Sequence, residues 1–464
     1  MPEIKGEIKE RRGTRRRKRV ADKEFYISNN GDDEGSGGYT SPFKTLKKAA
    51  EVVSPGDVII IKDGEYNEDT VVFEKSGTAE SPIRVRPENK FGAVINGTSL
   101  VFKGVNDYSV SGLVFHDTEK PAVSVIGDSA RNVFSSLILV DCGKRSDISC
   151  SVFFGSDRGE YNVLEFSSLK YHSDKRGSDS LPIGVMVGTG IAEEGEGGNR
   201  RSVLNGNTFD GYSNGMVLGS APSGLRYSHT VEQNFIRNCT DNGILSLCGT
   251  SNIRDNLIIR CRKHGIYAKD GNSYNIENNR ITLCGIGIKA AGDDIAVRNN
   301  CISDFSGSGI EVEECKIPDP KIFIEQNTFA LKIRRSVPAL NLNKQLFSFL
   351  QHNIFYRCSL FSEDGAYTGA SGNVCYDVHA EGDHSGIFQK SIRFVSVDRG
   401  NYVNETKYGA SGWAASGSFS INTETLDVAE DLEEAFYNDS LLGGGSSNQA
   451  EYLNILRKDT TEKD

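Results

Sequence analysis

The sequence predicts an all-β fold, a right-handed parallel β-helix in which each coil of about 22 residues holds three short strands. The first observation is a recurring Asn followed by mostly apolar residues, in steps of 21 to 27 residues. The second is a Gly followed by Ile or Met, which recurs in phase with the Asn, mostly every 22 residues. The Asn series comprises Asn207, Asn234, Asn256, Asn279, Asn300, Asn327 and Asn353, and the Gly series comprises Gly215, Gly243, Gly265, Gly287 and Gly309.

The third observation is the alternation of apolar and polar residues within one coil, residues 266–287. We expect a strand over 266–269, a turn over 270–273 and a second strand over 274–278. A corner at Asn279 and a third strand with Ile281 and Leu283 complete the coil. Crossovers between parallel strands are overwhelmingly right-handed, which predicts the hand of the helix.

The corner Asn residues are expected to stack about 4.8 Å apart, one per coil, with their side-chain amides hydrogen bonded in a ladder. Asn also tolerates the left-handed backbone that such a corner needs. A leucine-rich repeat has a similar period and an Asn, but its Leu spacing and its helix are missing from this sequence.

Four cysteines lie five residues after an Asn of the series: Cys239, Cys261, Cys284 and Cys358. Stacked on one strand, they are expected to point into the core as small hydrophobes. The alternative is a metal site or disulfides, although no CxxC or Cys/His ligand spacing is present.

The composition fits a thin core with many turns, because only 37% of the residues are hydrophobic and 50 are Gly. Residues 58–397 have room for about 14 coils of roughly 24 residues. A net charge of −10 argues against general nucleic-acid binding by the rod.

We expect four segments: a basic arm over 1–22, an N-terminal cap over 23–66, the β-helix over 67–400 and a C-terminal cap or tail over 401–464. In the cap, Ser41-Pro42 is expected to begin a helix. The apolar face of this helix would carry Phe43, Leu46, Ala49 and Ala50. In the tail, short helices are expected over 426–436 and 451–458, with a linker over 443–448.

The arm has nine Lys or Arg among residues 1–20 and is expected to be disordered by itself. It can be an anchor on a larger protein assembly, a nucleic-acid-binding tail, a dibasic processing site or a solvated tail. The N-terminus lacks the apolar segment of a secretion signal, and no run is long enough to span a membrane. A cytoplasmic location or incorporation into a virion is therefore expected, with the ten cysteines reduced.

The first quarter of the chain resembles a known family. The resemblance rests on Phe25-Tyr26-Ile27-Ser28, Ser41-Pro42-Phe43-Lys44-Thr45-Leu46, Pro55-Gly56-Asp57-Val58, Asp63-Gly64-Glu65-Tyr66 and Ser76-Gly77-Thr78-Ala79-Glu80-Ser81-Pro82-Ile83. These runs are similar to the entry segment of pectate-lyase-like right-handed β-helix proteins, above all the alginate lyase and chondroitinase B group.

The resemblance implies cleavage of acidic polysaccharides by β-elimination, with a Lys as base, an Arg as acid and often a calcium ion that neutralises the uronate carboxylate. The catalytic blocks of that group are not matched here. Lys263-His264-Gly265 precedes the first strand of a coil and is not in the Arg-His-Gly context of the family. The closely spaced Asp pairs of calcium-dependent pectate lyases are absent from the expected strands.

The resemblance implies that ligands lie along the outer face of the strand that follows each Gly. The alternation places on that face Val217, Leu245, Leu247, Tyr267, Lys269, Lys289, Glu311 and Glu313, with Arg262, Lys263 and His264 at the adjoining turn. A second candidate is the acidic insertion 188–198, which either shapes a groove or is a solvent-exposed loop.

Each residue of the outer face is given a role. Tyr267 is expected to stack on a sugar ring, with Arg262 and Lys263 as further substrate-binding residues. Lys269 or Lys289 would remove the proton α to a uronate carboxylate if the other cation lowered its pKa, and His264 would act as acid. Glu311 and Glu313 would hold a divalent cation such as Ca²⁺. The alternative is a solvated sheet face in which Lys289 and Glu311 pair across neighbouring coils.

Two functions follow from these observations. The first is a glycan-binding β-helix that cleaves a polysaccharide as a lyase or hydrolase, carried on a virion or another assembly like a tailspike. The second is a non-enzymatic structural or decoration protein of such a particle, favoured by the basic arm and by the absence of a recognisable catalytic block.

Overall fold

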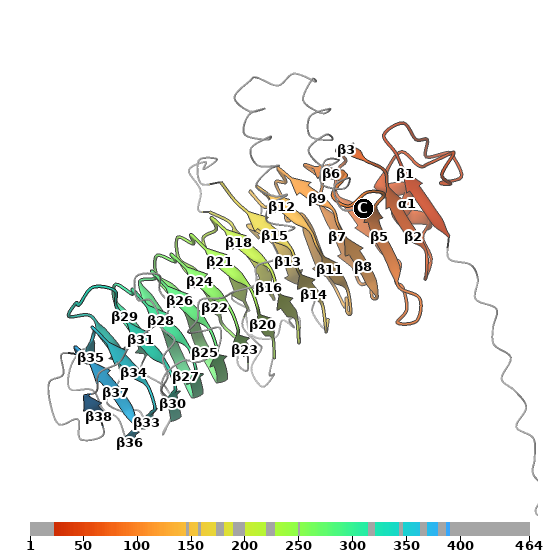
Figure 1. The fold of residues 1–464 in the computed structure, drawn as a ribbon. Helices are drawn as coiled ribbons and strands as arrows, with labels where there is room; N and C mark the ends of the chain where they lie inside the picture. The colour runs from red at the N-terminus through yellow and green to blue at the C-terminus, as the bar shows by residue number, and fades with distance from the viewer. Residues whose placement is uncertain are drawn as a thin grey trace, which may run out of the picture.

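The computed structural model describes residues 23–144, 148–155, 159–172, 181–188, 200–219, 228–248, 251–313, 321–342, 347–361, 369–378 and 387–389. Within these ranges the chain winds into a rod of parallel β-strands that runs from the N-terminal cap to β38 (Figure 1). This arrangement confirms the parallel β-helix predicted from the Asn and Gly repeats. The arm, the acidic insertion after Gly188 and the expected C-terminal helices lie outside the described residues.

Three parallel sheets form the walls of the rod. The first sheet is made of β4 (Val71–Phe73), β7 (Leu100–Lys103), β10 (Val123–Ile126), β13 (Cys150–Gly155), β16 (Ile183–Val187), β19 (Met216–Leu218), β22 (Asn242–Ser246), the first part of β25 (His264–Glu277), the first part of β27 (Ile286–Arg298), β29 (Ser308–Val312), β32 (Pro338–Asn341) and β35 (Ser359–Phe361). The second sheet follows it in each coil and is made of β1 (Glu24–Ile27), β2 (Val58–Ile61), β5 (Ile83–Pro87), β8 (Tyr108–Ser111), β11 (Val133–Ser135), β14 (Val163–Glu165), β17 (Val203–Asn205), β20 (Thr230–Glu232), β23 (Ser251–Arg254), the later parts of β25 and β27, β30 (Lys321–Glu325), β33 (Phe347–Gln351) and β36 (Gly369–Ser371).

The third sheet closes the coil and has 14 strands. They are β3 (Gly64–Tyr66), β6 (Ala93–Asn96), β9 (Val114–His116), β12 (Ile138–Val140), β15 (Ser168–Lys170), β18 (Thr208–Asp210), β21 (Phe235–Arg237), β24 (Leu257–Ile259), β26 (Arg280–Thr282), β28 (Cys301–Ser303), β31 (Thr328–Ala330), β34 (Ile354–Tyr356), β37 (Asn373–Tyr376) and β38 (Ile387–Gln389).

The first two sheets join where β25 and β27 run through both of them. The turn predicted over residues 270–273 is therefore wrong for this coil, because strand pairing continues from Gly271↔Gly292 after a register shift at Ala268/Gly271. The third strand is also shorter than predicted, since Leu283 follows β26 with a φ of +57° and turns the chain. In the preceding coil, β22 and β23 are separate strands, as the repeat predicted.

The core is a continuous file of aliphatic and aromatic side chains, because the residue between two outward positions always points inward. In the first sheet, Ile244, Ile266, Ile288 and Ile310 stack in register and are fully buried. The Gly series lies beside them for a steric reason. A Cβ on Gly265 would lie 2.5 Å from the Ile281 Cγ2 and 2.7 Å from the carbonyl oxygen of Gly287.

The predicted Asn ladder is present at the corner between the second and third sheets. The Nδ2 of each Asn donates to the Oδ1 of the Asn in the next coil at 3.0–3.1 Å, and the ladder extends one step further to Asn373. The left-handed backbone, however, belongs to the residue before the ladder Asn, as at Asp255 (φ +58°) and Asn278 (φ +55°). The expectation that the ladder Asn itself turns the corner is therefore wrong. The preceding residue turns the chain, and the Asn side chain is left to satisfy buried backbone groups.

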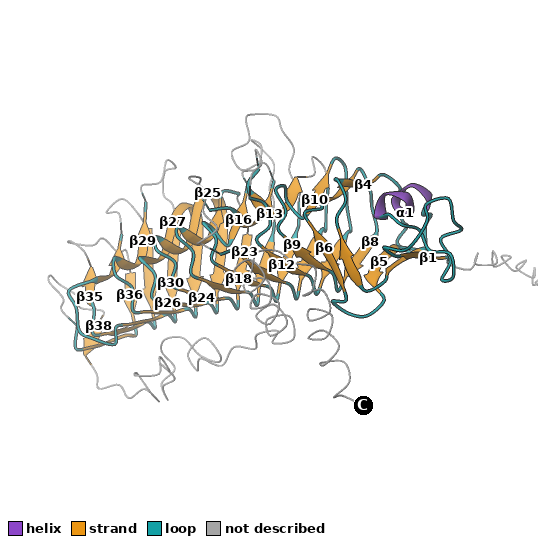
Figure 2. Cartoon of the chain, turned by 90° about the horizontal axis from the view of Figure 1, so that it is seen from above, coloured by secondary structure: helices purple, strands orange, loops and turns teal. Residues whose placement is uncertain are grey.

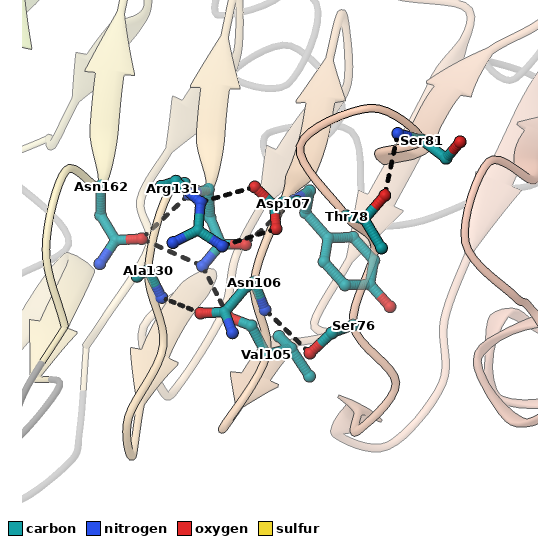
Figure 3. A network of polar contacts seen from close by, with 11 residues as sticks. Ser76, Thr78, Ser81, Val105, Asn106, Asp107, Ala130, Arg131 and Asn162 are labelled. Carbon is teal, nitrogen blue, oxygen red and sulfur yellow. Dashed lines mark hydrogen bonds and ion pairs between the residues drawn. The ribbon is translucent and has the colours of Figure 1, made fainter. Parts of the chain in front are cut away.

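A second polar ladder lies at the corner between the first and second sheets (Figure 3). Asn132 Nδ2 donates to Asn162 Oδ1 at 3.0 Å, and both side chains are buried. Beside it, the Arg131 guanidinium makes two 2.8 Å contacts with the Asp107 carboxylate of the preceding coil. Further along the same corner, His229 Nδ1 accepts the backbone N–H of Ser202 at 3.2 Å.

The cysteines are core residues. Cys239, Cys261, Cys284 and Cys358 are buried, and all nine cysteines in the described ranges are free. Hydrogen bonding with a neighbouring thiol and, after it, burial raise the pKa of Cys261 and Cys284, which keeps these thiols protonated. The structure therefore supports their predicted role as small hydrophobes.

Helix α1 (Leu46–Val52) lies at the N-terminal end of the rod (Figure 2). It begins later than predicted, because Thr45 is the N-cap residue and accepts the N–H of Lys48. Phe43 precedes the helix and forms a bridge with Ile27. The helix buries Leu46, Ala49 and Ala50 against the end of the core, as the apolar pattern predicted. None of the helices in the described ranges is long and apolar enough to cross a membrane.

Candidate functional site

The candidate site lies on the outer face of the first sheet, where one side chain per coil stands in register with the next. The pairing continues through Val217, Leu245, Tyr267, Lys289, Glu311 and Asn341. The predicted outer row is therefore correct in its order. Its accessible part begins at Leu245, since Val217 is only 4% exposed.

Lys289 occupies the centre of this row and bridges two carboxylates. Its Nζ lies 2.8 Å from Glu311 Oε1 and 3.0 Å from Glu313 Oε1. The Lys289 ammonium also lies 5.5 Å from the centre of the Tyr267 ring, and the Tyr267 hydroxyl donates to Glu313 Oε2 at 3.0 Å. This is the Lys289–Glu311 pairing that we gave as the alternative to a catalytic lysine.

The electrostatics of this cluster contradict the expected lowering of the lysine pKa. Partial burial opposes the charge on Lys289, but hydrogen bonds from its ammonium to Glu311 and Glu313 prevail and raise its pKa to about 12. Burial likewise opposes the charge on Glu313, and its hydrogen bonds with Lys289 and Tyr267 nevertheless lower its pKa. Because a base must be neutral to take a proton, Lys289 does not meet the condition that we set for a catalytic base.

His264 lies beside this cluster and has a defined hydrogen-bonding partner. Asn242 Nδ2 donates to Asn214 Oδ1 at 2.7 Å, so the Asn242 Oδ1 faces the His264 Nδ1 at 2.6 Å. An amide oxygen only accepts, so this geometry assigns the proton to Nδ1 and leaves the lone pair on Nε2. Burial and, next, the charge of Lys289 lower the pKa of His264, which favours the neutral imidazole near neutral pH.

The remaining predicted residues lie near His264 and Lys289. Lys263 lies at the corner before the strand, with its Nζ 2.7 Å from Asp241 Oδ1, and Arg262 beside it is exposed. Lys269 is half-buried, and its charge contributes to the low pKa of Glu313. The His264 and Tyr267 rings lie 5.0 Å apart between their centres. The eight predicted residues thus come from two neighbouring coils and the start of a third.

The sequence reasoning missed the amides at this site. Asn214 and Asn242 immediately precede Gly215 and Gly243, the Gly series that marks each coil, and His264 takes the same position before Gly265. That shared position was a readable signal that the three side chains stack. Asn341 was also missed, and its Nδ2 donates to Glu311 Oε2 at 3.4 Å.

The residues present do not fit a calcium ion between Glu311 and Glu313. Calcium requires six to eight oxygen ligands, and both carboxylates already accept from Lys289 and from Tyr267 or Asn341. The described part of the chain also has no cluster of three or more His, Cys, Asp or Glu side chains that could hold a metal. We therefore derive no chemical step through a metal.

Comparisons with known proteins agree with this fold. The family model for a right-handed β-helix region matches residues 189–331, and the model for chondroitinase B matches residues 41–146. The chain thus has the right-handed β-helix fold, and its residues 41–146 are similar to chondroitinase B.

Solved structures of alginate lyases share the fold at low sequence identity. The PL6 family alginate lyase AlyGC superposes with a TM-score of 0.61 and 18% identity over 80% of this chain and 56% of that one. The alginate lyase AlyF-OU02 has a TM-score of 0.58 and 15% identity over 88% of this chain and 95% of that one. Protein YwoF of Bacillus subtilis strain 168, itself uncharacterized, is 23% identical over 62% of this chain and 64% of its own length. The chain therefore spans less than two thirds of two of these relatives.

Proposed function

We propose that this protein binds a polysaccharide along the outer face of the first sheet and cleaves it by β-elimination. The observation that carries the proposal is the hydrogen bond from His264 Nδ1 to Asn242, which leaves the Nε2 lone pair of a neutral imidazole as a proton acceptor. The likeness to alginate lyases supports a polysaccharide as the ligand. Tyr267 beside His264 offers a ring for stacking on a sugar.

The reaction can be written with His264 as base and then acid. Nε2 takes the proton α to a uronate carboxylate, and the electron pair of that C–H bond forms a double bond as the glycosidic C–O bond breaks. The imidazolium then returns the proton to the departing oxygen, so protons and electrons balance. Lys263 and Arg262, which adjoin His264, supply positive charge for the carboxylate as negative charge develops there.

Cleavage is tested with alginate, pectate, chondroitin and capsular polysaccharides, following the absorbance of the unsaturated product and new reducing ends. His264→Gln is expected to lower the rate by about a hundredfold or more, as the loss of a general base does. His352→Gln, at a corner between the second and third sheets, is the matched control and is expected to keep the wild-type rate. A wild-type rate for His264→Gln refutes the assigned base, and silence with every polymer refutes cleavage.

We also propose that the protein is carried on a larger assembly, such as a virion, through the basic arm of residues 1–20. Nine cations in 20 residues suit an acidic partner surface. Deleting residues 1–20 is expected to abolish incorporation into the assembly while polysaccharide binding by the rod is retained. If the protein without residues 1–20 were incorporated at the wild-type level, the anchoring role of the arm would be refuted.

A further inference from the structure

Every carboxylate oxygen of Glu311 and Glu313 has a donor from this chain. Glu311 faces the Lys289 ammonium with Oε1 and the Asn341 amide with Oε2. Glu313 faces Lys289 with Oε1 and the Tyr267 hydroxyl with Oε2. The two glutamates therefore share a network with three partner residues, Lys289, Asn341 and Tyr267, and the ammonium of Lys289 is the one cation among these three.

The position of this ammonium distinguishes the network from a surface ion pair. The Lys289 side chain is 18% exposed, whereas Lys103, which pairs with Glu74 further along the first sheet, is 60% exposed. Lys289 also contacts two carboxylates at 2.8 and 3.0 Å, and Lys103 contacts one at 3.4 Å. Two carboxylates so close together repel each other unless a cation lies between them.

We propose that the Lys289 ammonium takes the place of a divalent cation between Glu311 and Glu313, and that removing it turns these residues into a binding site for a hard cation such as Ca²⁺ or Tb³⁺. Without the ammonium, the cluster offers up to four carboxylate oxygens and the Tyr267 hydroxyl, the ligand type that such cations prefer. The native cluster leaves those oxygens occupied, so it binds no such cation. The inference rests on the cluster alone and is independent of the proposed cleavage.

The first experiment is a titration of full-length protein with Tb³⁺, with the luminescence excited through tyrosine. Lys289→Ala is expected to bind Tb³⁺ about tenfold or more tightly than the wild type, because the competing intramolecular charge is gone. Lys289→Ala/Glu313→Gln is expected to lose this gain. Lys103→Ala is the matched control and is expected to leave Tb³⁺ binding at the wild-type level, since it frees a single carboxylate.

The second experiment measures thermal stability and keeps the test valid if Lys289→Ala is weakly folded. Ca²⁺ is expected to raise the Tm of Lys289→Ala and to leave the Tm of wild type and of Lys289→Ala/Glu313→Gln unchanged, because only a ligand of the folded state stabilises it. Adding Tyr267→Phe to Lys289→Ala is expected to weaken the tyrosine-sensitised luminescence while the Ca²⁺ effect on Tm persists.

Two results would overturn the inference. One is a Tb³⁺ signal of the wild type that Glu311→Gln or Glu313→Gln abolishes, which would show that the native cluster already binds a cation. The other is a folded Lys289→Ala protein whose Tb³⁺ affinity and Ca²⁺-dependent Tm equal those of the wild type.

Discussion

Replacing Asn279 by Ala should be among the most costly single changes in the rod. The Asn279 Oδ1 accepts the backbone N–H and the Nδ2 of Asn256, both at 3.0 Å. Its Nδ2 donates to the carbonyl oxygen of Ile253 at 2.9 Å and to Asn300 Oδ1 at 3.0 Å. All of these groups are buried, so water cannot replace the lost partner.

The expected cost follows from counting these bonds. Four hydrogen bonds at about 1 kcal/mol each give roughly 4 kcal/mol, and Asn256 Nδ2 keeps its bonds to Val231 and Arg254, which lowers the figure to about 3 kcal/mol. The cost is measured by urea denaturation. Because a solenoid can open in segments, hydrogen exchange of the amides in β24, β26 and β28 should be measured as well. Asn252→Ala, on the exposed side of β23, is the matched control and should change stability by less than about 0.5 kcal/mol. A cost for Asn279→Ala as small as that of Asn252→Ala would refute the ladder as a source of stability.

Three further predictions concern pH and packing. Burial lowers the pKa of His229 to about 4, below the 6.5 of the exposed group, so the unfolded chain takes up the proton first and stability falls by about 3 kcal/mol between pH 6.5 and 4. Gly265→Ala should cost about 1–3 kcal/mol, because its Cβ would meet Ile281 at 2.5 Å, whereas a Cβ on Gly38 would lie 3.5 Å from its nearest neighbour. On the acid side of the pH profile (the acid limb), kcat/KM should fall only below pH 6.5, because the lowered pKa of His264 leaves this base unprotonated until a lower pH is reached.

Each of these predictions has a measurement that checks it. For His229, urea denaturation is carried out at several pH values. In His229→Asn the free energy of unfolding should no longer fall by this amount between pH 6.5 and 4, and an unchanged fall would assign the pH dependence to other groups. The same denaturation at neutral pH should separate Gly265→Ala from Gly38→Ala, and equal stability would remove the steric reason for the Gly series. In the rate profile, Lys289→Met should move the acid limb to higher pH, and an unmoved limb would contradict the charge coupling with His264.

The architecture could be predicted from the sequence because each coil repeats the same local rules. Alternation sends Ile266 inward and Tyr267 outward in every register, and the spacing of Asn256 and Asn279 stacks their amides. The burial of the four cysteines could be predicted in the same way, because each lies five residues after an Asn of the series. Local details failed where two arrangements satisfy one pattern, as at the corner before Asn279, where Asn278 rather than the ladder residue takes the left-handed backbone.

The chemistry of the outer face was decided only by the tertiary structure. The repeat of about 22 residues was enough to place Tyr267, Lys289 and Glu311 in one row. It could not determine that Lys289 is held by two carboxylates or that Asn242 orients His264. The pKa of a side chain and the tautomer of an imidazole depend on distances of about 3 Å across coils, and those distances exist only after the coils have stacked.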